Sequence, residues 1–514
     1  MTDCDIFIIG GGINGCGVAR ELAGRGYRIV LAEKNDLSSG TSSWSTKLIH
    51  GGLRYLEYYE FTLVRKALRE REVLMEMAPH LIQPLRFILP HQPDMRPKWL
   101  IRAGLFLYDY LGPRKKLKGS HSVNLAKDEA GQILKSHFTS AFAYSDCMVD
   151  DNRLTILNAR AAADLGAHIL PQCKVLAAEK NNDGLWHIET EQGAFTARMV
   201  INAGGPWADE IRTIASANMG DATTGDVNLQ NGPSHNQKTI RLVRGSHIIV
   251  KKHFDHDKAY IFQNSDGRIL FAIPYLDDFT LIGTTDVDHD GAPDTPQISE
   301  EEISYICREV SAYLKQEITA QDVLFTYSGV RPLVEDGAAD AKSATRDYEL
   351  RFEAGLANSW LNILGGKLTT YRTLALQVAD KIAAILPAPH QMDSTAPLPG
   401  GDMPSADFPQ FLANLQSAHP ECDARQIKRM AKAYGTDCYQ ILGQKSGDIA
   451  QGIAFGHGLY QAEVDYLMAH EWAMTADDIL MRRTKLGYWF DKAGTAKLAS
   501  YMAQRQKAKA KAKK

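Results

Sequence analysis

Apolar and polar positions along the first 33 residues follow a strand, turn, helix, strand order. Residues 5–10 form a short apolar run, and Gly-Gly-Gly-Ile-Asn-Gly follows at positions 10–15. Apolar residues then recur at helical spacing as far as residue 24, and a second apolar run at 27–33 ends on an acid, Glu33. The pattern therefore predicts two strands joined by a helix, with G-x-G-x-x-G between the first strand and the helix.

The glycine turn has the spacing of a dinucleotide-binding fingerprint. Gly10 permits a tight turn, Gly12 lets the backbone approach a diphosphate, and Gly15 lets the helix pack against the strand. The unpaired N–H groups at the helix N-terminus would bind the diphosphate. Glu33 can accept hydrogen bonds from an adenosine ribose, and its charge disfavours the 2′-phosphate of NADP. This stretch alone predicts a dinucleotide site and does not choose between NAD and FAD.

The pattern beyond Glu33 predicts further domains. Residues 34–47, here called the Ser/Thr segment, suit a loop over a cofactor, and the double glycine at 51–52 suggests close approach to a flat group. The pattern predicts a long helix at 57–77, a small antiparallel sheet at 169–195 and a strand returning to the first sheet at 198–209. It also predicts a second antiparallel-sheet domain at 246–286 and a capped helix at 299–314.

Composition and charge exclude several classes of protein. A chain of 514 residues predicts two or three domains, and a net charge of −3 gives no argument for nucleic-acid binding. Seven scattered cysteines, never in C-x-x-C, fit a reducing compartment and argue against a disulfide framework, a zinc ribbon or a dithiol redox centre. The chain enters a strand at once, leaving no room for a signal sequence, and no run reaches the ~18 apolar residues of a spanning helix. We expect a cytoplasmic protein.

Contact with a membrane surface stays open because of residues 98–118. This stretch is amphipathic and rich in aromatic residues, and it ends in a basic cluster at Arg114, Lys115, Lys116 and Lys118. Such a pattern can dock at an anionic bilayer. The alternative is a buried helix followed by a solvated basic loop.

Six motifs occur in an order that is similar to one known family. They lie at residues 10–15, 47–56, 202–207, 283–286, 327–332 and 365–372. Together they resemble the FAD-dependent glycerol-3-phosphate dehydrogenases of aerobic respiration, within the D-amino-acid-oxidase-like flavoenzyme superfamily. The chain departs from that pattern in a long polar insertion, in a Lys/Ala tail, and in Gly204, where many relatives carry threonine.

The resemblance implies a fold of the α/β and α+β classes. A discontinuous Rossmann-like FAD-binding domain, an antiparallel-sheet substrate domain and a C-terminal helical domain are expected, with a mobile insertion and a disordered tail. The FAD-binding domain is expected at 1–85, 150–215 and 325–390, and the substrate domain at 86–149 and 239–324. The C-terminal helical domain is expected at 395–505, the mobile insertion at 216–238 and the disordered tail at 506–514.

The implied reaction is the oxidation of sn-glycerol 3-phosphate to dihydroxyacetone phosphate. A hydride would pass from C2 to flavin N5 of a non-covalent FAD, and electrons would pass on to ubiquinone. The family is usually a homodimer held peripherally at the inner face of the cell membrane. Two rival interpretations stay open: an oxidase on the same fold that uses oxygen, and a non-catalytic FAD-binding adaptor.

The matching motifs give the expected site residues. A dianionic substrate requires cations, which arginine supplies as a bidentate fork and lysine as a point charge. Expected substrate contacts are Arg54, Tyr55, Arg331, Arg346, Lys367 and Thr369. Expected FAD contacts are Gly10, Gly12, Ile13, Asn14, Gly15, Glu33, Thr41, Ser42, Ser45, Thr46, Lys47, Leu48, Gly51, Gly52, Val175, Gly204, Gly366, Lys367, Leu368 and Thr369.

Four residues are expected to be catalytic: His247, His50, Arg54 and Arg331. His247 is the first choice for general base, because a neutral imidazole can take the proton of the C2 hydroxyl. His50 and Arg54 are expected to orient the alcohol or stabilise its developing negative charge. The alternative for His247 is a core histidine, and the alternative for each arginine is a salt bridge.

Overall fold

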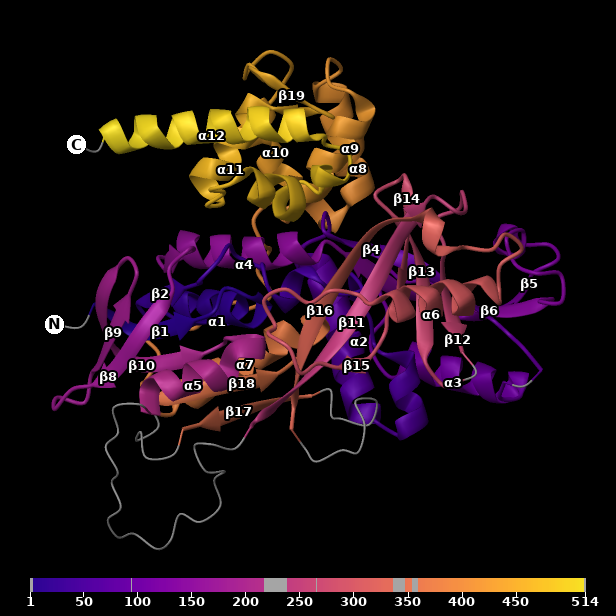
Figure 1. Ribbon diagram of the computed structural model, residues 1–514, viewed down its shortest axis with the longest axis horizontal. Helices are drawn as coiled ribbons and strands as arrows, with labels where there is room; N and C mark the ends of the chain where they lie inside the picture. The colour runs from indigo at the N-terminus through magenta and orange to yellow at the C-terminus, as the bar shows by residue number, and fades with distance from the viewer. Residues whose placement is uncertain are drawn as a thin grey trace, which may run out of the picture.

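The computed structural model contains two large sheets and a separate C-terminal helical domain (Figure 1). It describes residues 3–93, 95–216, 238–264, 266–335, 347–353 and 359–512. The insertion predicted at 216–238 falls outside these ranges except at its two ends. Among the described residues, no helix has both the length and the apolar character needed to cross a membrane.

The first sheet has eight strands and contains the N-terminal fingerprint. Its main strands run β17-β18-β10-β1-β2-β7, and β8 and β9 extend it through β10. Neighbours from β18 to β7 are parallel, as expected for strands joined by crossover helices. The strand bounds are β1 Cys4–Ile9, β2 Ile29–Ala32, β7 His168–Leu170, β8 Val175–Lys180, β9 Trp186–Thr190, β10 Gly193–Asn202, β17 Tyr348–Phe352 and β18 Trp360–Gly365.

Alternation along the central strand β1 divides the core of this sheet into two layers. Ile6 and Ile8 pack with apolar side chains of α1 (Ile13–Gly24), α4 (Asp151–Asp164) and α7 (Tyr371–Ala383). Phe7 belongs to the opposite layer, against which α5 (Ala208–Ser216) packs. Both faces are thus buried, which explains why the predicted strands read as continuous apolar runs.

The second sheet has ten strands and is largely antiparallel. Its order is β15-β11-β14-β13-β12-β4-β6-β3, with β16 paired to β11 and β5 paired to β6. Helices α2 (Phe61–Met77) and α3 (Lys98–Tyr110) cover one face, and α6 (Glu300–Ser311) covers the other. The strand bounds are β3 Leu48–Ile49, β4 Ile82–Pro90, β5 His121–Asn124, β6 Ser140–Val149, β11 Ile240–Lys251, β12 Ala259–Gln263, β13 Ile269–Tyr275, β14 Phe279–Gly283, β15 Val287–Asp288 and β16 Val323–Val334.

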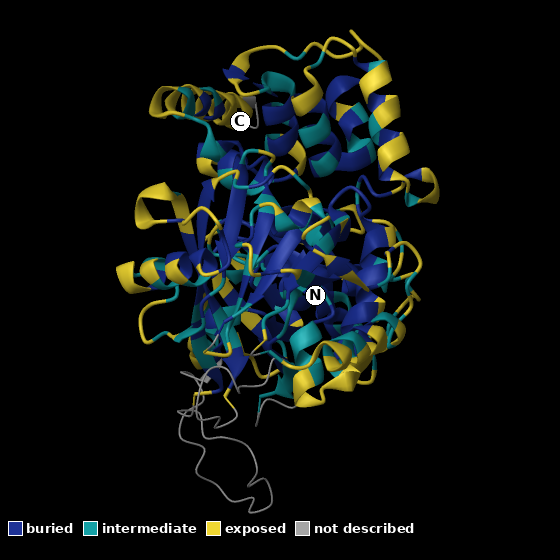
Figure 2. Ribbon diagram, turned by 90° about the vertical axis from the view of Figure 1, so that its right-hand side faces the viewer, coloured by how far each residue is buried: buried dark blue, intermediate teal, exposed yellow. Residues whose placement is uncertain are grey.

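Two segments expected in the FAD-binding domain pair in this second sheet instead. β3 pairs with β6, and β16 pairs with β11 along nearly its whole length. The expected boundary differs because β16 forms its backbone hydrogen bonds with β11, a long strand that is its neighbour in space and not in sequence. Buried residues concentrate in the strands of both sheets, and exposed residues lie mainly on the outer loops and helices (Figure 2).

The C-terminal domain is helical, with its own apolar core. Its elements are α8 Phe408–Ala418, α9 Ala424–Tyr434, α10 Cys438–Leu442, β19 Ala454–Gly456, β20 Leu459–Tyr460, α11 Gln461–His470, the π-helical turn η9 Asp478–Arg483, and α12 Lys492–Ala512. The tail expected to be disordered from 506 is instead the end of α12, as far as Ala512. Alanine and lysine are strong helix formers, and the upstream turns supply the nucleus.

Candidate active site

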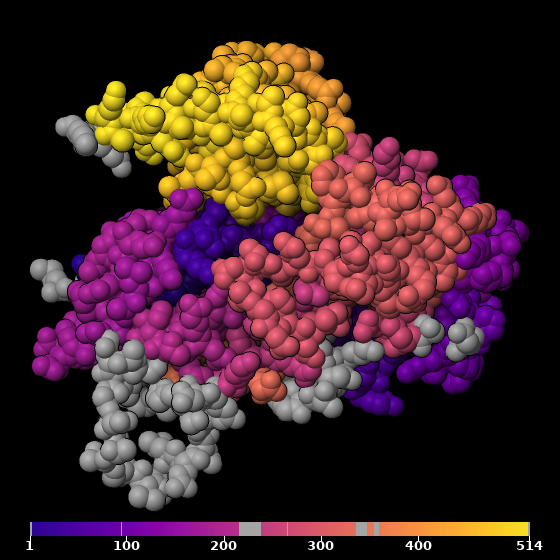
Figure 3. Space-filling model, viewed as in Figure 1, coloured from indigo at the N-terminus to yellow at the C-terminus, as the bar shows by residue number. Residues whose placement is uncertain are grey.

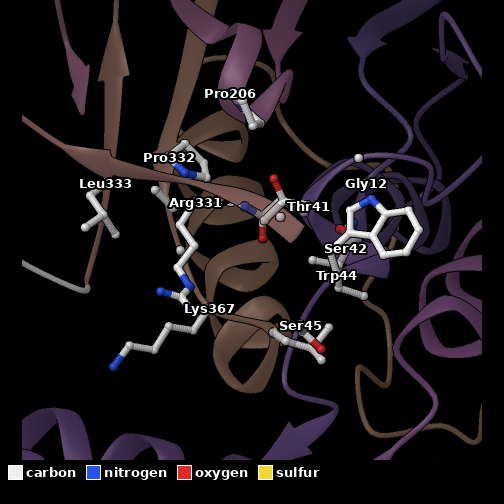
Figure 4. Close-up of a pocket in the computed structure, with 18 of the residues that line it drawn as sticks. Gly12, Thr41, Ser42, Trp44, Ser45, Pro206, Arg331, Pro332, Leu333 and Lys367 are labelled. Atoms are coloured by element: carbon white, nitrogen blue, oxygen red, sulfur yellow. Dashed lines mark hydrogen bonds between the residues drawn. The ribbon is translucent and has the colours of Figure 1, made fainter. Parts of the chain in front are cut away.

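One cavity of about 440 Å³ connects the two sheets. At one end, here called the glycine end, it is lined by Gly10, Gly12, Asn14, Glu33 and Ser42. At the other, here called the charged end, it is lined by His50, Tyr55, Asp286, Arg331 and Lys367. Figure 4 shows part of the lining, with Gly12, Ser42 and Trp44 on the right and Arg331 and Lys367 on the left.

The glycine end is shaped by backbone packing. A Cβ atom at Gly15 would lie 1.9 Å from the Gly10 carbonyl oxygen, so only glycine lets α1 start this close to β1. Helix α1 begins at Ile13, whose N–H donates to Ser42 Oγ over 2.9 Å. Asn14 Nδ2 donates to the Gly365 carbonyl over 3.1 Å. The helix N-terminus is therefore held from the Ser/Thr segment and from the turn after β18.

Glu33 lies at the end of β2, as predicted, and supports the glycine turn. Its two carboxylate oxygens accept hydrogen bonds from the backbone N–H of Gly11 over 2.7 Å and of Asn35 over 2.8 Å. Burial raises the pKa of this carboxyl, while the two N–H donors oppose the rise. Each carboxylate oxygen has a second lone pair with which it could accept a ribose hydroxyl.

The Ser/Thr segment lines the cavity with hydroxyls and backbone. Thr41, Ser42, Ser45 and Thr46 all face it, together with Trp44. The backbone carbonyl of Ser45 accepts a hydrogen bond from Tyr327 OH over 2.8 Å. This contact ties the segment to β16 of the second sheet.

Cations from three separate elements line this cavity. Arg54 and Tyr55 come from the 3-10 turn η2 (Leu53–Tyr58), Arg331 comes from β16, and Lys367 follows β18. The Lys367 ammonium lies 3.8 Å from the centre of the Tyr55 ring. Arg54 donates to Tyr58 OH over 3.1 Å.

Arg331 is held in place by two neighbours that also line the cavity. It forms an ion pair with Asp286 and donates to Thr284 Oγ1 over 2.9 Å. Asp286 was quoted within the family-like motif at 283–286, yet it is absent from the predicted site residues. A carboxylate beside the arginine fixes the direction of the guanidinium fork and partly neutralises its charge.

The two predicted histidines lie in different surroundings. His50 lines the cavity, and its pKa is lowered chiefly by burial, with nearby Lys367 adding to the effect and Asp146 opposing it. His247 is not among the lining residues. Its ring is fully buried, stacks on Tyr327 at 4.7 Å, and contacts the lining residue Thr46, whose Oγ1 is 3.0 Å from His247 Nε2.

Most of the predicted contacts line the cavity, including Leu48, Gly52, Val175, Gly204, Gly366, Leu368 and Thr369. Gly15, Lys47 and Gly51 do not: Lys47 pairs with buried Asp151, and the Gly51 N–H donates to Tyr108 OH over 2.9 Å. Arg346 lies outside the described residues. Sequence reasoning missed Trp44, Tyr144, Phe271 and Thr284. The strand residues Tyr144 and Phe271 carry no sequence signal, because any half-buried strand contains such side chains.

Comparison with known proteins identifies the family. Residues 5–372 match the model of the FAD dependent oxidoreductase family, and residues 393–513 match that of the C-terminal domain of alpha-glycerophosphate oxidase. The chain therefore belongs to the FAD-dependent oxidoreductases.

Two curated relatives and one solved structure cover nearly the whole chain. A D-erythritol 1-phosphate dehydrogenase of Brucella abortus is 45% identical, over 94% of this chain and 94% of the relative. A glycerol-3-phosphate dehydrogenase of Pseudomonas aeruginosa is 45% identical, over 97% and 94%. The structure of a glycerol-3-phosphate dehydrogenase from Bacillus halodurans complexed with FAD is similar at a TM-score of 0.73, with 26% identity over 98% and 90% of the two chains.

The cavity fits the cofactor of this family. The glycine end offers a helix N-terminus without a Cβ at Gly12, and the buried Asn14 Oδ1 has no hydrogen-bond partner within the described protein. The expected fold and FAD as cofactor are thereby confirmed. The fingerprint residues, the Ser/Thr segment and the turn at Gly366 would hold the FAD.

Proposed function

We propose that this protein oxidises sn-glycerol 3-phosphate to dihydroxyacetone phosphate and passes the electrons to ubiquinone. One observation carries the proposal: the cavity that is lined by the dinucleotide fingerprint is also lined by Arg54, Arg331 and Lys367. Three cations suit a phosphate dianion better than the single carboxylate of an amino acid. FAD, when bound, supplies the acceptor for the hydride that leaves C2.

The charged end supplies binding and proton transfer. Arg331 presents a fork already oriented by Asp286, and Lys367 adds a point charge, so together they would bind the phosphate. We assign the hydroxyl proton to an imidazole nitrogen of His50, because this residue lines the cavity and its lowered pKa keeps the ring neutral near pH 7. His247 then acts behind Thr46, whose position it fixes.

Replacing each of the two histidines by alanine tests this assignment. His50→Ala should lower kcat by roughly 10²–10⁴-fold with FAD retained, the usual contribution of a general base. His247→Ala and Thr46→Val should each have a smaller effect. If His247→Ala has the larger effect and Thr46→Val shares it, the base is His247 acting through the Thr46 hydroxyl.

D-erythritol 1-phosphate is the second candidate substrate, because a dehydrogenase named for it is as similar to this chain as one named for glycerol 3-phosphate. Anaerobic addition of each compound to the FAD-loaded protein, followed by the loss of visible absorbance, separates them. We expect a higher kcat/KM for glycerol 3-phosphate. No bleaching with either compound would reject both dehydrogenase activities and favour a non-catalytic adaptor.

Quinone reduction and membrane attachment belong to the same proposal. Helix α3 exposes Trp99, Phe106 and Tyr110, and it contacts η2, which also exposes Tyr58. The basic cluster beside it largely has partners within the protein, since Lys115 pairs with Glu76 and Arg114 pairs with Asp109. Apolar contact would therefore dominate membrane binding. This face would bring the protein, as a homodimer, to the inner surface of the cytoplasmic membrane.

Two assays test the membrane and acceptor proposals. Sedimentation with anionic vesicles should fall when Trp99 and Phe106 are replaced by serine, whereas Leu176→Ser, at another exposed apolar site, should have no effect. Quinone reduction and peroxide yield should be measured in one anaerobic-to-aerobic series. Stoichiometric peroxide with no quinone reduction would identify an oxygen-using oxidase.

A further inference from the structure

The C-terminal helical domain contacts the segment that lines the cavity. Figure 3 shows this domain, in yellow, seated on the N-terminal part of the chain and on the second sheet. Among the ion pairs that cross that junction, two groups lie next to residues 36–47: one joins Arg482 and Arg483 to Asp36, and the other joins Lys485 to Asp150 and Asp151 of α4 and its N-cap. This stretch contains the lining residues Thr41, Ser42, Ser45 and Thr46.

The first group holds the start of the stretch. The buried carboxylate of Asp36 accepts from both Arg482 and Arg483 of the π-helical turn η9, with Arg483 Nη2 at 2.8 Å from Oδ1. Consecutive side chains of an α-helix point in different directions, yet here two neighbouring guanidinium groups meet at one carboxylate. Arg483 also donates to the Glu471 carbonyl over 2.7 Å, which anchors it in its own domain.

The second group holds the end of the stretch through α4. Lys485 is 5% exposed, and its ammonium donates to Asn152 Oδ1 and lies 3.5 Å from Asp150. Asn152 Nδ2 in turn donates to Ser43 Oγ over 2.6 Å. A lysine of the C-terminal domain is thus two hydrogen bonds away from the Ser/Thr segment.

Asp151 extends this connection to a lining residue. Its carboxylate is fully buried, accepts from Ser45 Oγ over 2.7 Å and from Lys47 Nζ over 3.0 Å, and lies 3.8 Å from Lys485 Nζ. Lys485 and Lys47 therefore share the adjacent carboxylates of Asp150 and Asp151. Without Lys485, two buried or half-buried carboxylates would face a single lysine, and Asp151 would shift relative to Ser45.

We propose that the C-terminal domain positions the FAD site: Lys485, with Arg482 and Arg483, holds residues 36–47 in the shape that lines the cavity. The inference depends on FAD binding and not on which polyol phosphate is oxidised. Lys485 is a positioning residue, since the partners described for its ammonium are Asn152, Asp150 and Asp151, which are not among the residues that line the cavity.

Charge removal at Lys485 tests the proposal in the full-length protein. Lys485→Met should raise the FAD dissociation constant of the apoprotein by about tenfold, a typical coupling between contacting residues, and should change the band shape of bound FAD. Lys485→Arg should restore part of the affinity. Lys497→Met is the matched control, because Lys497 lies in the same domain and donates to the Ala454 carbonyl, away from the cavity.

A double-mutant cycle separates positioning from general destabilisation. If Lys485 acts through Asp151, the effects of Lys485→Met and Ser45→Ala on FAD affinity should be strongly non-additive. Unchanged affinity and spectrum in a folded Lys485→Met protein, simple additivity, or an equal loss in Lys497→Met would each overturn the proposal. Should Lys485→Met not fold, Arg482→Met replaces it in the measurements of FAD affinity and spectrum, because its partly exposed side chain contacts the other end of the stretch.

Discussion

The two ends of the cavity are built from different materials. The glycine end consists mainly of backbone, and Gly10, Gly12 and Ile13 lie within four consecutive residues of the chain. The charged end consists of side chains from elements far apart in the chain, such as His50, Arg331 and Lys367. The glycine end therefore depends on shape, and an added Cβ is the damaging change there. The charged end depends on charge, and the loss of a cation is the damaging change there.

The largest expected effect is at the glycine end. Gly15→Ala places a methyl group 1.9 Å from the Gly10 carbonyl, and since both groups are backbone-fixed, α1 must move away from β1. We expect the purified protein to lose FAD, measured as the ratio of bound FAD to protein.

The matched control is Gly104→Ala on α3, where an added Cβ meets nothing within 4 Å. Its FAD content should equal that of the unchanged protein. A stoichiometric FAD content in Gly15→Ala would show that the two ends do not differ in the way described.

The next effect is at the charged end and should leave FAD bound. Arg331→Ala should lower kcat/KM for glycerol 3-phosphate by roughly 10–200-fold, the ~1.5–3 kcal/mol of a hydrogen bond to a charged group. Oxidation of glycerol, which lacks the phosphate, should change much less. Arg308→Ala, an exposed arginine on α6, is the control. Equal losses on both substrates would remove Arg331 from the phosphate site.

A smaller effect should appear in the pH dependence of the free enzyme. His50 must be neutral to accept a proton, and its lowered pKa keeps it neutral until the pH falls below about 6.5. The ratio of kcat/KM between the unchanged protein and His50→Asn should therefore be flat above that pH. Below it, the ratio should decline by up to about tenfold per pH unit.

Taking the ratio removes the ionisation of the substrate phosphate, near pH 6, which affects both proteins alike. A ratio that already falls while the pH is still above about 6.5 would be inconsistent with a His50 base whose pKa is lowered.

The smallest effect concerns a buried histidine away from the cavity. Both ring nitrogens of His80 lack a hydrogen-bond partner within the described protein, and burial lowers its pKa to about 3. The unfolded chain binds this proton near pH 6.5, so stability should fall as the pH drops from 6.5, by at most about 1.4 kcal/mol per pH unit. His80→Leu should make that slope shallower in urea unfolding, because one of the buried histidines is removed, whereas His168→Leu, at an exposed site, should leave it unchanged. Unchanged slopes in both would place the protonation elsewhere.

The comparison also explains what sequence reasoning found and missed. The glycine end was predictable, because G-x-G-x-x-G and Glu33 act through local backbone geometry. The capped helix α6 was equally local, and its Ser299–Glu302 capping box is present. At the charged end, the family-like motifs predicted Arg331 and Lys367 as site residues, but Asp286 and Tyr144 were not predicted.

The roles of the two histidines show the limit most clearly. His247 was the first choice for general base, but only the packed sheet shows that its ring contacts Thr46 and stacks on Tyr327. The contacts of Lys485 with α4 had no sequence signal, because they join residues more than 300 positions apart.

The sequence by itself determined a dinucleotide fingerprint, the apolar strands of the first sheet, a separate helical C-terminus and, by its motifs, the family. These features depend on neighbours in the chain or on spacing within one element. The tertiary structure alone decided which cations line one cavity, which histidine is among its lining residues, and that the C-terminal domain reaches residues 36–47. Those facts depend on strand pairing and on buried charge pairs between distant segments, and local propensity does not encode such contacts.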